Sequence, residues 1–235
     1  MYIDIHNHSL FGVDDGATDI EESVNLLRSA YNQGVSKIIL TPHYRYGMFK
    51  YPVEEISKNF EQLRKEAENI GIEIFLGCEY HVNSKITEYL ASGRCSTLAG
   101  SDYVLTEYSY DTEYEYIKKY TRELVDNGYI PVIAHAERYG CLLNDYKLCM
   151  ELSDIGALIQ INASSVLGYE GRESVKFCKK LLKNNIADIV ASDTHDMTER
   201  VNRLNECHSY IAKKYGVGYA DNIFYNNPLK IIKNI

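Results

Sequence analysis

Apolar, β-branched runs alternate along the chain with segments whose apolar residues recur at helical spacing. The runs predict seven strands, at residues 2–5, 37–40, 73–76, 103–106, 130–134, 157–161 and 187–191. Helical spacing predicts helices at 20–33, 54–70 and 113–127, and a last helix near 197–215. Gly34, Gly71, Gly128 and Gly156 each precede a predicted strand, where a glycine commonly ends a helix. The pattern therefore predicts regular alternation of strand and helix.

Strand and helix in alternation, with about 30 residues per unit, are typical of right-handed βαβ crossovers and a parallel sheet. Seven such units favour closure of the sheet, so we predict an α/β fold: a distorted seven-stranded parallel (β/α) barrel that is similar to a TIM barrel. No linker or low-complexity stretch divides residues 1–235, which predicts a single domain. The tail from Ile223 to Ile235 is expected to pack on the outside or to contact a partner.

Composition narrows the classes of protein that fit this fold. With 235 residues and 45% hydrophobic content, the chain can fill one sizeable core. A net charge of −8 argues against broad binding to nucleic acid. No window approaches the roughly 20 apolar residues that cross a bilayer, and no positively charged, apolar presequence stands at the start. We therefore expect a cytoplasmic protein without membrane insertion, whose six cysteines are ordinary reduced thiols.

Histidine and acidic residues stand where the predicted strands end. They are His6, His8, His43, Glu79, Glu107, His135, Asp193 and His195. Parallel α/β barrels build their active sites at the carboxyl ends of the strands, so these side chains should converge. Imidazole and carboxylate ligands suit Zn, Mn or Fe, and a carboxylate can bridge two ions. The sequence therefore predicts the multinuclear metal site of a metallohydrolase.

Two pairs of these residues share a spacing that brings both side chains to one ion. His6 and His8 are two residues apart, so on a strand both imidazoles point to the same side. Asp193 and His195 repeat this spacing near the other end of the chain. Closure of the barrel would bring the last strand beside the first.

Six short motifs carry a resemblance to a known family. They are His6-Asn7-His8, Asp14-Asp15-Gly16-Ala17, Thr41-Pro42-His43, Gly77-Cys78-Glu79, His135-Ala136-Glu137-Arg138-Tyr139 and Ser192-Asp193-Thr194-His195. Together and in this order, they resemble the polymerase and histidinol phosphatase (PHP) superfamily. More narrowly, they resemble the bacterial manganese-dependent protein-tyrosine phosphatases of capsule and exopolysaccharide synthesis. The match extends from residue 2 to about residue 200.

The resemblance implies a PHP-type barrel that holds three divalent metal ions, with Mn expected and Fe, Zn or Co as alternatives. By this resemblance, the first ion is held by His6, His8, Glu79 and Asp193. Glu79 also binds the second ion, whose other ligands are Glu107 and His135. The third ion is held by His43 and His195. Asp14 is expected as a further ligand in preference to Asp15.

Several other residues have expected roles around the ions. Arg138 suits a phosphate clamp, because a guanidinium fork matches phosphoryl oxygens; its alternative is a salt bridge to Glu137. Arg45 is a second candidate for phosphate binding. Aromatic residues near the strand ends are expected as walls of the substrate site; the candidates are Tyr44, Tyr46, Phe49, Tyr108 and Tyr139. His43, Asp193 or a metal is expected to assist the leaving oxygen. His81 is expected in a loop role and His208 on the surface.

The function implied by the resemblance is hydrolysis of phosphotyrosine, with the tyrosine-rich tail of a bacterial tyrosine kinase as the partner. Clustered cations would lower the pKa of a bound water and supply hydroxide. A cysteine-dependent phosphatase is disfavoured, because no cysteine has an arginine six positions later. Two alternatives stay open: hydrolysis of a small phosphomonoester such as histidinol phosphate, and a metal-stabilised regulatory module without catalysis.

Overall fold

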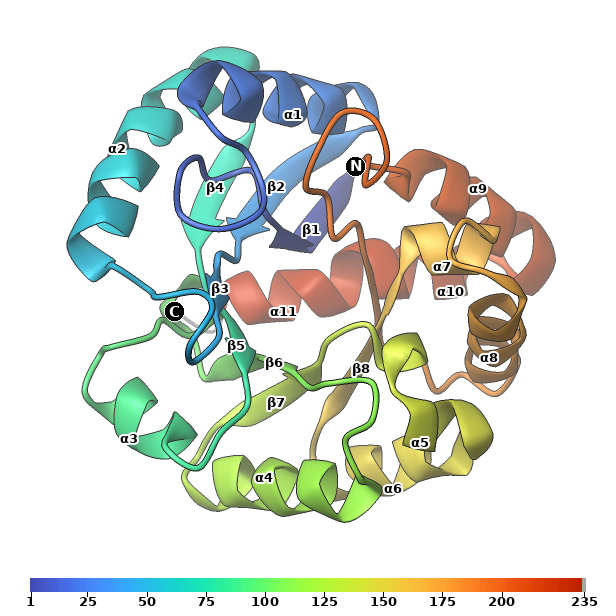
Figure 1. Ribbon diagram of the computed structural model, residues 1–235. Helices are drawn as coiled ribbons and strands as arrows, with labels where there is room; N and C mark the ends of the chain where they lie inside the picture. Colours follow the sequence, from blue (N-terminus) through green and yellow to red (C-terminus); the bar gives the residue numbers. More distant parts are fainter. Residues whose placement is uncertain (234–235) are drawn as a thin grey trace.

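The computed structural model describes residues 1–233, in which helices surround a core of parallel strands (Figure 1). Seven strands are β1 (Tyr2–Asn7), β2 (Val35–Leu40), β4 (Glu73–Leu76), β6 (Tyr103–Glu107), β7 (Ile130–Ile133), β8 (Leu158–Asn162) and β9 (Ile189–Ala191). Each of them overlaps one predicted strand, and all their pairings are parallel. The predicted α/β class is confirmed.

The strands form two sheets, so the prediction of one seven-stranded barrel is wrong in strand number and continuity. One sheet has the order β1-β2-β4 and the other the order β3-β5-β6-β7-β8-β9. Two short strands, β3 (His43–Tyr44) and β5 (Glu79–His81), come shortly after β2 and β4. The strand conformation is interrupted before each of them, and these two interruptions are the breaks between the sheets. Pro42 has no N–H to donate at the first break. At the second, a Cβ on Gly77 would lie 3.0 Å from the side chains of Ile39 and Leu98.

The two ends of the strand series nevertheless lie side by side, as the sequence predicted. Asn7 forms a parallel bridge with Thr194. The backbone N–H of His8 donates to the carbonyl of Thr194 at 2.9 Å, and the N–H of Asp193 donates to the carbonyl of His6 at 2.9 Å. The segment after β9 is thereby fixed beside the end of β1.

Helices of different lengths connect the strands. They are α1 (Ile20–Asn32), α2 (Val53–Ile70), α3 (Ile86–Ala91), α4 (Tyr114–Asp126), α5 (Gly140–Asn144), α6 (Lys147–Ile155), α7 (Ala163–Leu167), α8 (Arg172–Lys183), α9 (Leu204–Tyr215), α10 (Val217–Asp221) and α11 (Asn227–Lys233). Two 3₁₀ turns, η1 (Leu98–Gly100) and η2 (Ala136–Arg138), and a π-helical turn, η3 (Asn222–Asn226), complete the fold. Helices α1, α2 and α4 confirm three predictions.

The helix predicted near 197–215 begins only at Leu204. Residues before it form a loop, because the carboxylate of Asp196 accepts hydrogen bonds from the backbone N–H groups of Thr198, Glu199 and Arg200. An acidic side chain that bonds the following N–H groups stabilises a turn instead of a helical start. The apolar periodicity alone therefore placed the start of this helix too early in the sequence.

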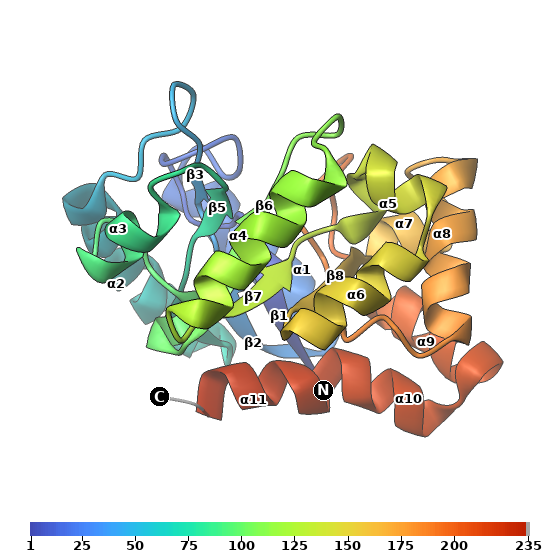
Figure 2. The same cartoon turned by 90° about the horizontal axis from the view of Figure 1, so that it is seen from below.

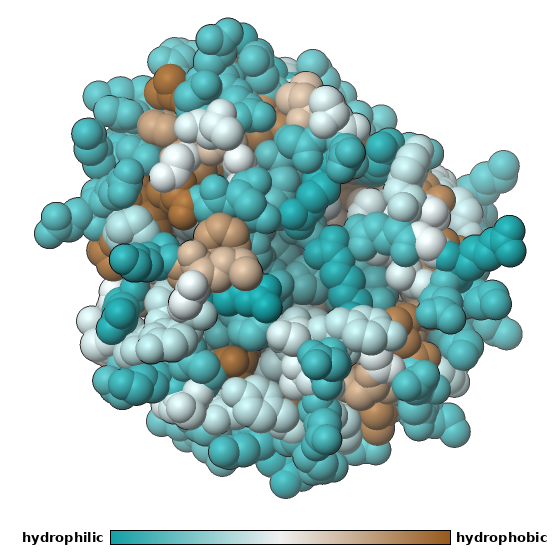
Figure 3. Space-filling model, in the orientation of Figure 1, coloured by the Kyte–Doolittle hydropathy of each residue, from teal (hydrophilic) through white to brown (hydrophobic). Residues whose placement is uncertain are grey.

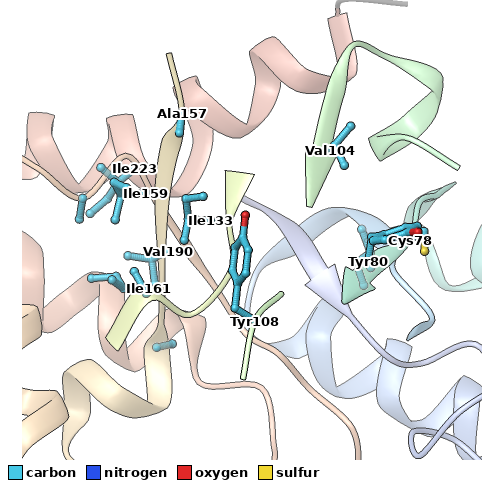
Figure 4. Packing of buried hydrophobic residues seen from close by; sticks show 14 of the residues in the cluster. Cys78, Tyr80, Val104, Tyr108, Ile133, Ala157, Ile159, Ile161, Val190 and Ile223 are labelled. Carbon is cyan, nitrogen blue, oxygen red and sulfur yellow. The ribbon is translucent and has the colours of Figure 1, made fainter. Parts of the chain in front are cut away.

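Buried apolar side chains lie on both sides of the strands. Between the strands and the surrounding helices, strand residues such as Val104, Ile133, Ile159, Ile161 and Val190 belong to one large cluster (Figure 4). A second cluster contains residues on the opposite face of the strands, among them Ile3, Ile5, Val132 and Ile189.

Helix α11 covers the amino end of the strands, where its Ile231 and Ile232 join the second apolar cluster. Figure 2 shows α10 and α11 lying across this end of the molecule. The expectation that the tail packs against the outside is confirmed through Lys233, and its last two residues, 234–235, lie outside the described residues. Among the described helices, none is long and apolar enough to cross a membrane.

Candidate metal centre

Eight of the nine predicted metal-binding side chains, all except Asp14, gather at the carboxyl ends of the strands. Seven of them, His6, His8, His43, Glu79, His135, Asp193 and His195, are buried, and Glu107 is half-buried. Among the described residues, three groups of side chains bring ligand atoms close enough to hold a metal ion: His6, His8, Glu79 and Asp193; His43, Glu79 and Glu107; and His8, Asp15, His43 and His195. Glu79 and the histidines at positions 8 and 43 each belong to two groups.

The first group agrees in full with the predicted site of the first ion. The Nε2 atoms of His6 and His8 are 3.2 Å apart, and Oε2 of Glu79 lies 3.0 Å from the first and 3.2 Å from the second. Oδ1 of Asp193 is 3.3 Å from His6 Nε2 and 3.6 Å from His8 Nε2. Ligands about 2.1 Å from one ion lie roughly 3.0–3.4 Å from each other in octahedral or tetrahedral geometry. These four atoms therefore have the spacing of a shared coordination sphere.

The second group centres on the carboxylate of Glu79. Its Oε2 lies 3.1 Å from Nδ1 of His43, which is 3.9 Å from Oε2 of Glu107. Its Oε1 lies 2.8 Å from Nε2 of His135. Glu79 thus faces two groups, as a bridging ligand would. His135 contacts the carboxylate of Glu79 but does not belong to any of the three groups. His43 belongs to both the second and the third group.

The third group contains Asp15, the acidic residue that the sequence analysis disfavoured. Its Oδ1 lies 3.4 Å from His43 Nε2 and 3.5 Å from His195 Nε2. Asp14 stands outside the three groups, because its oxygens already accept hydrogen bonds from His8 Nδ1 at 2.8 Å and from the N–H groups of His43 and Gly16 at 3.0 Å. The preference for Asp14 as ligand is corrected: Asp14 orients His8, in the way that outer carboxylates orient metal-binding imidazoles.

A divalent metal fits this set of donors. Four buried atoms that face one another lack a hydrogen-bond partner within residues 1–233: His43 Nδ1, Glu79 Oε2, Glu107 Oε2 and His195 Nε2. Burial, and then the charge of Glu79, raise the pKa of Glu107 to about 8. Buried, unpartnered polar atoms are costly and carboxylates in contact repel, unless a cation lies between them.

The backbone at two of these residues is strained. His135 has φ 31° and Asp193 has φ 54°, in the left-handed region that side chains other than glycine seldom adopt. Each such residue costs about 1–3 kcal/mol and persists where its surroundings hold it. At Asp193 the holding contacts include the N–H bond to His6 and a bond from the Asn162 amide to Oδ2 at 2.9 Å.

Two arginines lie beside the metal-binding groups. Arg138 donates from Nε and Nη2 to the carboxylate of Glu170 at 3.0 and 3.1 Å, and its Nη1 lies 2.8 Å from Asp193 Oδ2. Its partner is therefore Glu170, and not the Glu137 that the sequence analysis offered as the alternative. Arg200 donates from Nη2 to both oxygens of Asp193 at 3.1 Å. Arg200 was not predicted from the sequence.

A cavity of about 390 Å³ opens over the metal-binding groups. It is lined by Asp15, His43, Arg45, Met48, Phe49, Glu79, Glu107, His135, Arg138 and Arg200. Figure 3 looks onto this end of the molecule, opposite α11, and shows a central hollow surrounded mainly by hydrophilic residues. The cavity thus exposes three acidic groups, two imidazoles and three guanidinium groups to one bound ligand.

Comparison with known proteins assigns the chain to a family. A family model described as "Capsular polysaccharide synthesis, CpsB/CapC" matches residues 2–233. The tyrosine-protein phosphatase CpsB of Streptococcus pneumoniae is 40% identical over 238 residues, which cover 98% of each chain. The chain belongs to the CpsB/CapC family. This assignment confirms the resemblance to the capsule-type tyrosine phosphatases.

Other CpsB/CapC relatives agree in sequence and in structure. The tyrosine-protein phosphatase YwqE of Bacillus subtilis is 32% identical over 216 residues, 91% of this chain and 85% of that protein. A crystal structure from work on YwqE of Bacillus subtilis and CpsB of Streptococcus pneumoniae, described as metal-dependent tyrosine phosphatases, superposes with a TM-score of 0.92 at 31% identity. The superposition covers 99% of this chain and 94% of that one.

Within this CpsB/CapC fold, two of the aromatic residues predicted as substrate walls, Tyr44 and Tyr108, do not line the catalytic cavity. Tyr44 is buried against Tyr80 and Tyr89, with ring centroids 4.9 and 5.7 Å away. Tyr108 is buried against Tyr139 at 5.6 Å. As walls of the catalytic cavity both are therefore wrong: Tyr44 packs into the core, and Tyr108 lines a separate cavity beside Val82 and Tyr116.

Phe49 is the aromatic side chain that lines the cavity. Its ring stacks on the imidazole of His43 with centroids 5.1 Å apart and planes inclined by 10°. Its loop folds back through a bridge between Arg45 and Phe49, which brings Met48 to the cavity as well. Arg45, the second predicted phosphate ligand, is also on the cavity wall.

The two remaining histidines stand outside the metal-binding groups, as expected. His81 Nε2 lies 3.2 Å from the hydroxyl of Ser109. His208 Nε2 lies 3.0 Å from Asp221 Oδ1 at an exposed pair. The site as a whole can therefore hold several cations and, beside them, an anion that three arginines contact.

Proposed function

We propose that this protein is a metal-dependent protein-tyrosine phosphatase that acts in capsular or exopolysaccharide synthesis. The observation that carries the proposal is the shared cavity, where three groups of metal ligands and three arginines face one another. Such a site neutralises a phosphoryl group from several sides. The family relationship supports the tyrosyl substrate, since the curated relatives carry the name tyrosine-protein phosphatase.

The finer features of the centre are part of the same proposal. Three divalent ions, with Mn favoured over Fe, Zn and Co, would be held by the three groups, with Asp15 in place of Asp14. His135 would complete the sphere around the Glu79 bridge, from which it is 2.8 Å away. The two sheets would together form a distorted barrel of the PHP type. The partner would be a phosphotyrosine protein, with the tyrosine-rich tail of a bacterial tyrosine kinase as the first candidate.

When bound, divalent ions supply a hydroxide nucleophile at neutral pH and offset the charge on the phosphoryl oxygens. The protein's own part is to hold the phosphate in line with that nucleophile. Within residues 1–233, Nη1 of Arg200 has its nearest acidic neighbour, Asp15 Oδ2, 3.6 Å away, beyond hydrogen-bond distance, so it can turn a donor toward the phosphate. Arg138 has less freedom, because Glu170 occupies its Nε–Nη2 edge and Asp193 Oδ2 lies 2.8 Å from its Nη1, which leaves one Nη1–H for the phosphate.

Asp193 and His43 have different chemical roles in this arrangement. Although burial opposes it, the charges of Arg138 and His6 hold the pKa of Asp193 well below its usual range. Asp193 is therefore a poor proton donor; its roles would be to hold the first ion and to position the arginines. Burial lowers the pKa of His43, whose ring lines the cavity. A phenol leaves with a pKa of about 10, so little proton donation is required.

A parallel rate measurement tests the function. Initial rates are compared on a phosphotyrosyl peptide, the matching phosphoseryl peptide and histidinol phosphate, with Mn supplied. The phosphotyrosyl peptide should be hydrolysed fastest. Faster hydrolysis of histidinol phosphate would favour the small-molecule alternative, and no hydrolysis of any of the three would favour a regulatory module without catalysis.

The metal requirement is tested on the same substrate. Chelation should abolish hydrolysis and Mn should restore it, whereas alkylation of thiols should leave it, because five of the six cysteines are buried. Activity that survives chelation and is lost on alkylation would refute the metal-dependent mechanism.

A further inference from the structure

A second cavity of about 390 Å³ lies beside the catalytic one. It is lined by His81, Val82, Tyr108, Thr112, Glu113 and Tyr116. Its volume lies near the lower end of ligand pockets, which measure about 300–1,000 Å³. It is too small for a folded partner but large enough for a single side chain.

The two cavities share one wall, formed by the ends of β5 and β6. Glu107 lines the catalytic cavity, and the next residue, Tyr108, lines the second. On the neighbouring strand Glu79 lines the first cavity and His81 the second. His81 is the register partner of Glu107, and the N–H of Val82 donates to the carbonyl of Glu107 at 2.9 Å. The two cavities therefore lie on either side of the same two strand ends.

The walls of the second cavity are chiefly aromatic and apolar. The rings of Tyr108 and Tyr116 meet edge to face at 90°, with centroids 6.5 Å apart. Tyr116 is 39% exposed, so part of its ring is open to a ligand, and Val82 is buried beneath it. Glu113 is the one carboxylate on the lining, and neither Lys nor Arg is there. An anion is therefore disfavoured, and a neutral ring gains edge-to-face contacts.

We propose that this second cavity is a subsite for an aromatic side chain of the substrate polypeptide, two residues from the phosphotyrosine. This inference rests on the proposed function. In an extended chain, side chains two residues apart point to the same side and are separated by about 7 Å. One such side chain would enter the catalytic cavity while the other enters the subsite. A small phosphomonoester cannot reach both.

Three phosphotyrosyl peptides of equal length test the subsite in the wild-type enzyme. One has alanine on both sides of the phosphotyrosine, and the other two carry a single phenylalanine two residues before or two residues after it. One phenylalanine peptide should have a KM about threefold to tenfold below that of the alanine peptide, with kcat unchanged, because one aromatic contact has that magnitude. Equal KM values for all three peptides would overturn the proposal.

Two variants localise the effect. Thr112→Trp fills the cavity, and Tyr116→Ala removes an aromatic wall; each should erase the advantage of the phenylalanine peptide. Free phosphotyrosine, which is too short to reach the subsite, should keep its kcat/KM in both. Tyr116→Phe, which keeps the ring, and Tyr31→Ala, which removes a 50% exposed tyrosine from α1, should retain the advantage.

The remaining outcomes separate the subsite from the proposed function. If the wild type hydrolyses no phosphotyrosine substrate, the proposed function fails and the subsite with it. If free phosphotyrosine is hydrolysed normally but the advantage survives both Thr112→Trp and Tyr116→Ala, only the subsite is refuted. A parallel loss on free phosphotyrosine in both variants would also refute it, since the side chains would then act on the catalytic cavity.

Discussion

The two ends of the strands are equally buried but are held by opposite kinds of interaction. At the amino end Ile3, Ile5 and Ile231 are fully buried, and α11 covers them. At the carboxyl end His6, His8 and Glu79 are also fully buried, but each is a polar group whose contacts are other polar groups. Apolar packing is non-directional, whereas the polar end depends on the position of each atom.

The difference teaches that stability and chemistry occupy separate parts of this fold. The polar end contains the strained backbone of His135 and Asp193 and the repulsion between Glu79 and Glu107. The strain and the repulsion both lower the free energy of unfolding. The apolar end and the core between strands and helices offset this loss by burying apolar surface. Substitutions at one end should therefore change turnover without unfolding, and those at the other should do the reverse.

The largest expected effect is that of Glu79→Gln. It keeps the shape of the side chain but removes the charge from the atom shared by two metal-binding groups. Phosphotyrosine turnover should fall by about 10³-fold or more, and bound metal, measured by elemental analysis, should fall as well. Glu55→Gln on the exposed surface of α2 is the control and should change neither. Normal metal content and rate in Glu79→Gln would remove Glu79 from the centre.

Next in size is Arg200→Lys, which keeps the charge but loses the planar fork. Turnover should fall by about 10²-fold with metal content unchanged, since donors to a developing oxyanion contribute in this range. Arg203→Lys is the matched control from the same loop, because Arg203 stacks on Tyr169 at 3.7 Å and does not line the cavity. An Arg200→Lys enzyme with unchanged kcat/KM would show that the cations alone bind the phosphate.

At the apolar end, Ile231→Ala should lower the free energy of unfolding by about 2–4 kcal/mol, because it leaves a cavity between α11 and the strands. Metal content and turnover of the folded enzyme should stay at the wild-type level. Val217→Ala, at a 60% exposed position of α10, should change stability by less than about 0.5 kcal/mol. Loss of metal together with stability in Ile231→Ala would contradict the separation of the two ends.

The sequence predicted the apolar parts of this comparison well. Hydrophobic periodicity depends on which face of an element is buried, and α1, α2 and α4 were located by it to within a residue or two. The ligands His6, His8, Glu79 and Asp193 were predicted together because strand ends converge in parallel folds. Both predictions depend on features common to parallel α/β proteins: a buried face on each helix and the convergence of the strand ends.

What the sequence could not predict depends on the direction of single side chains. Asp14 and Asp15 are adjacent and chemically identical, and only the hydrogen bonds that occupy Asp14 decide which of them faces His43 and His195. Tyr44 and Phe49 are both aromatic residues near one strand end, but the bridge between Arg45 and Phe49 turns only the latter into the cavity. Arg200 follows the motif at Asp193 by seven residues, and this proximity was the signal that could have identified it.

The smallest expected effect concerns Phe49, where an apolar contact works at the polar end. Its ring stacks on His43 and lines the catalytic cavity, so it can pack against the phenyl ring of phosphotyrosine. Phe49→Ala should lower kcat/KM for free phosphotyrosine about tenfold, the value of one aromatic contact. A small alkyl phosphate should lose at most about twofold, because it has no ring to stack. Tyr46→Ala in the same loop, at an 82% exposed position off the cavity wall, is the control and should affect neither substrate. Equal losses on both substrates would show that Phe49 acts by holding His43, and the selectivity for a phenyl ring would then have to come from outside the cavity wall.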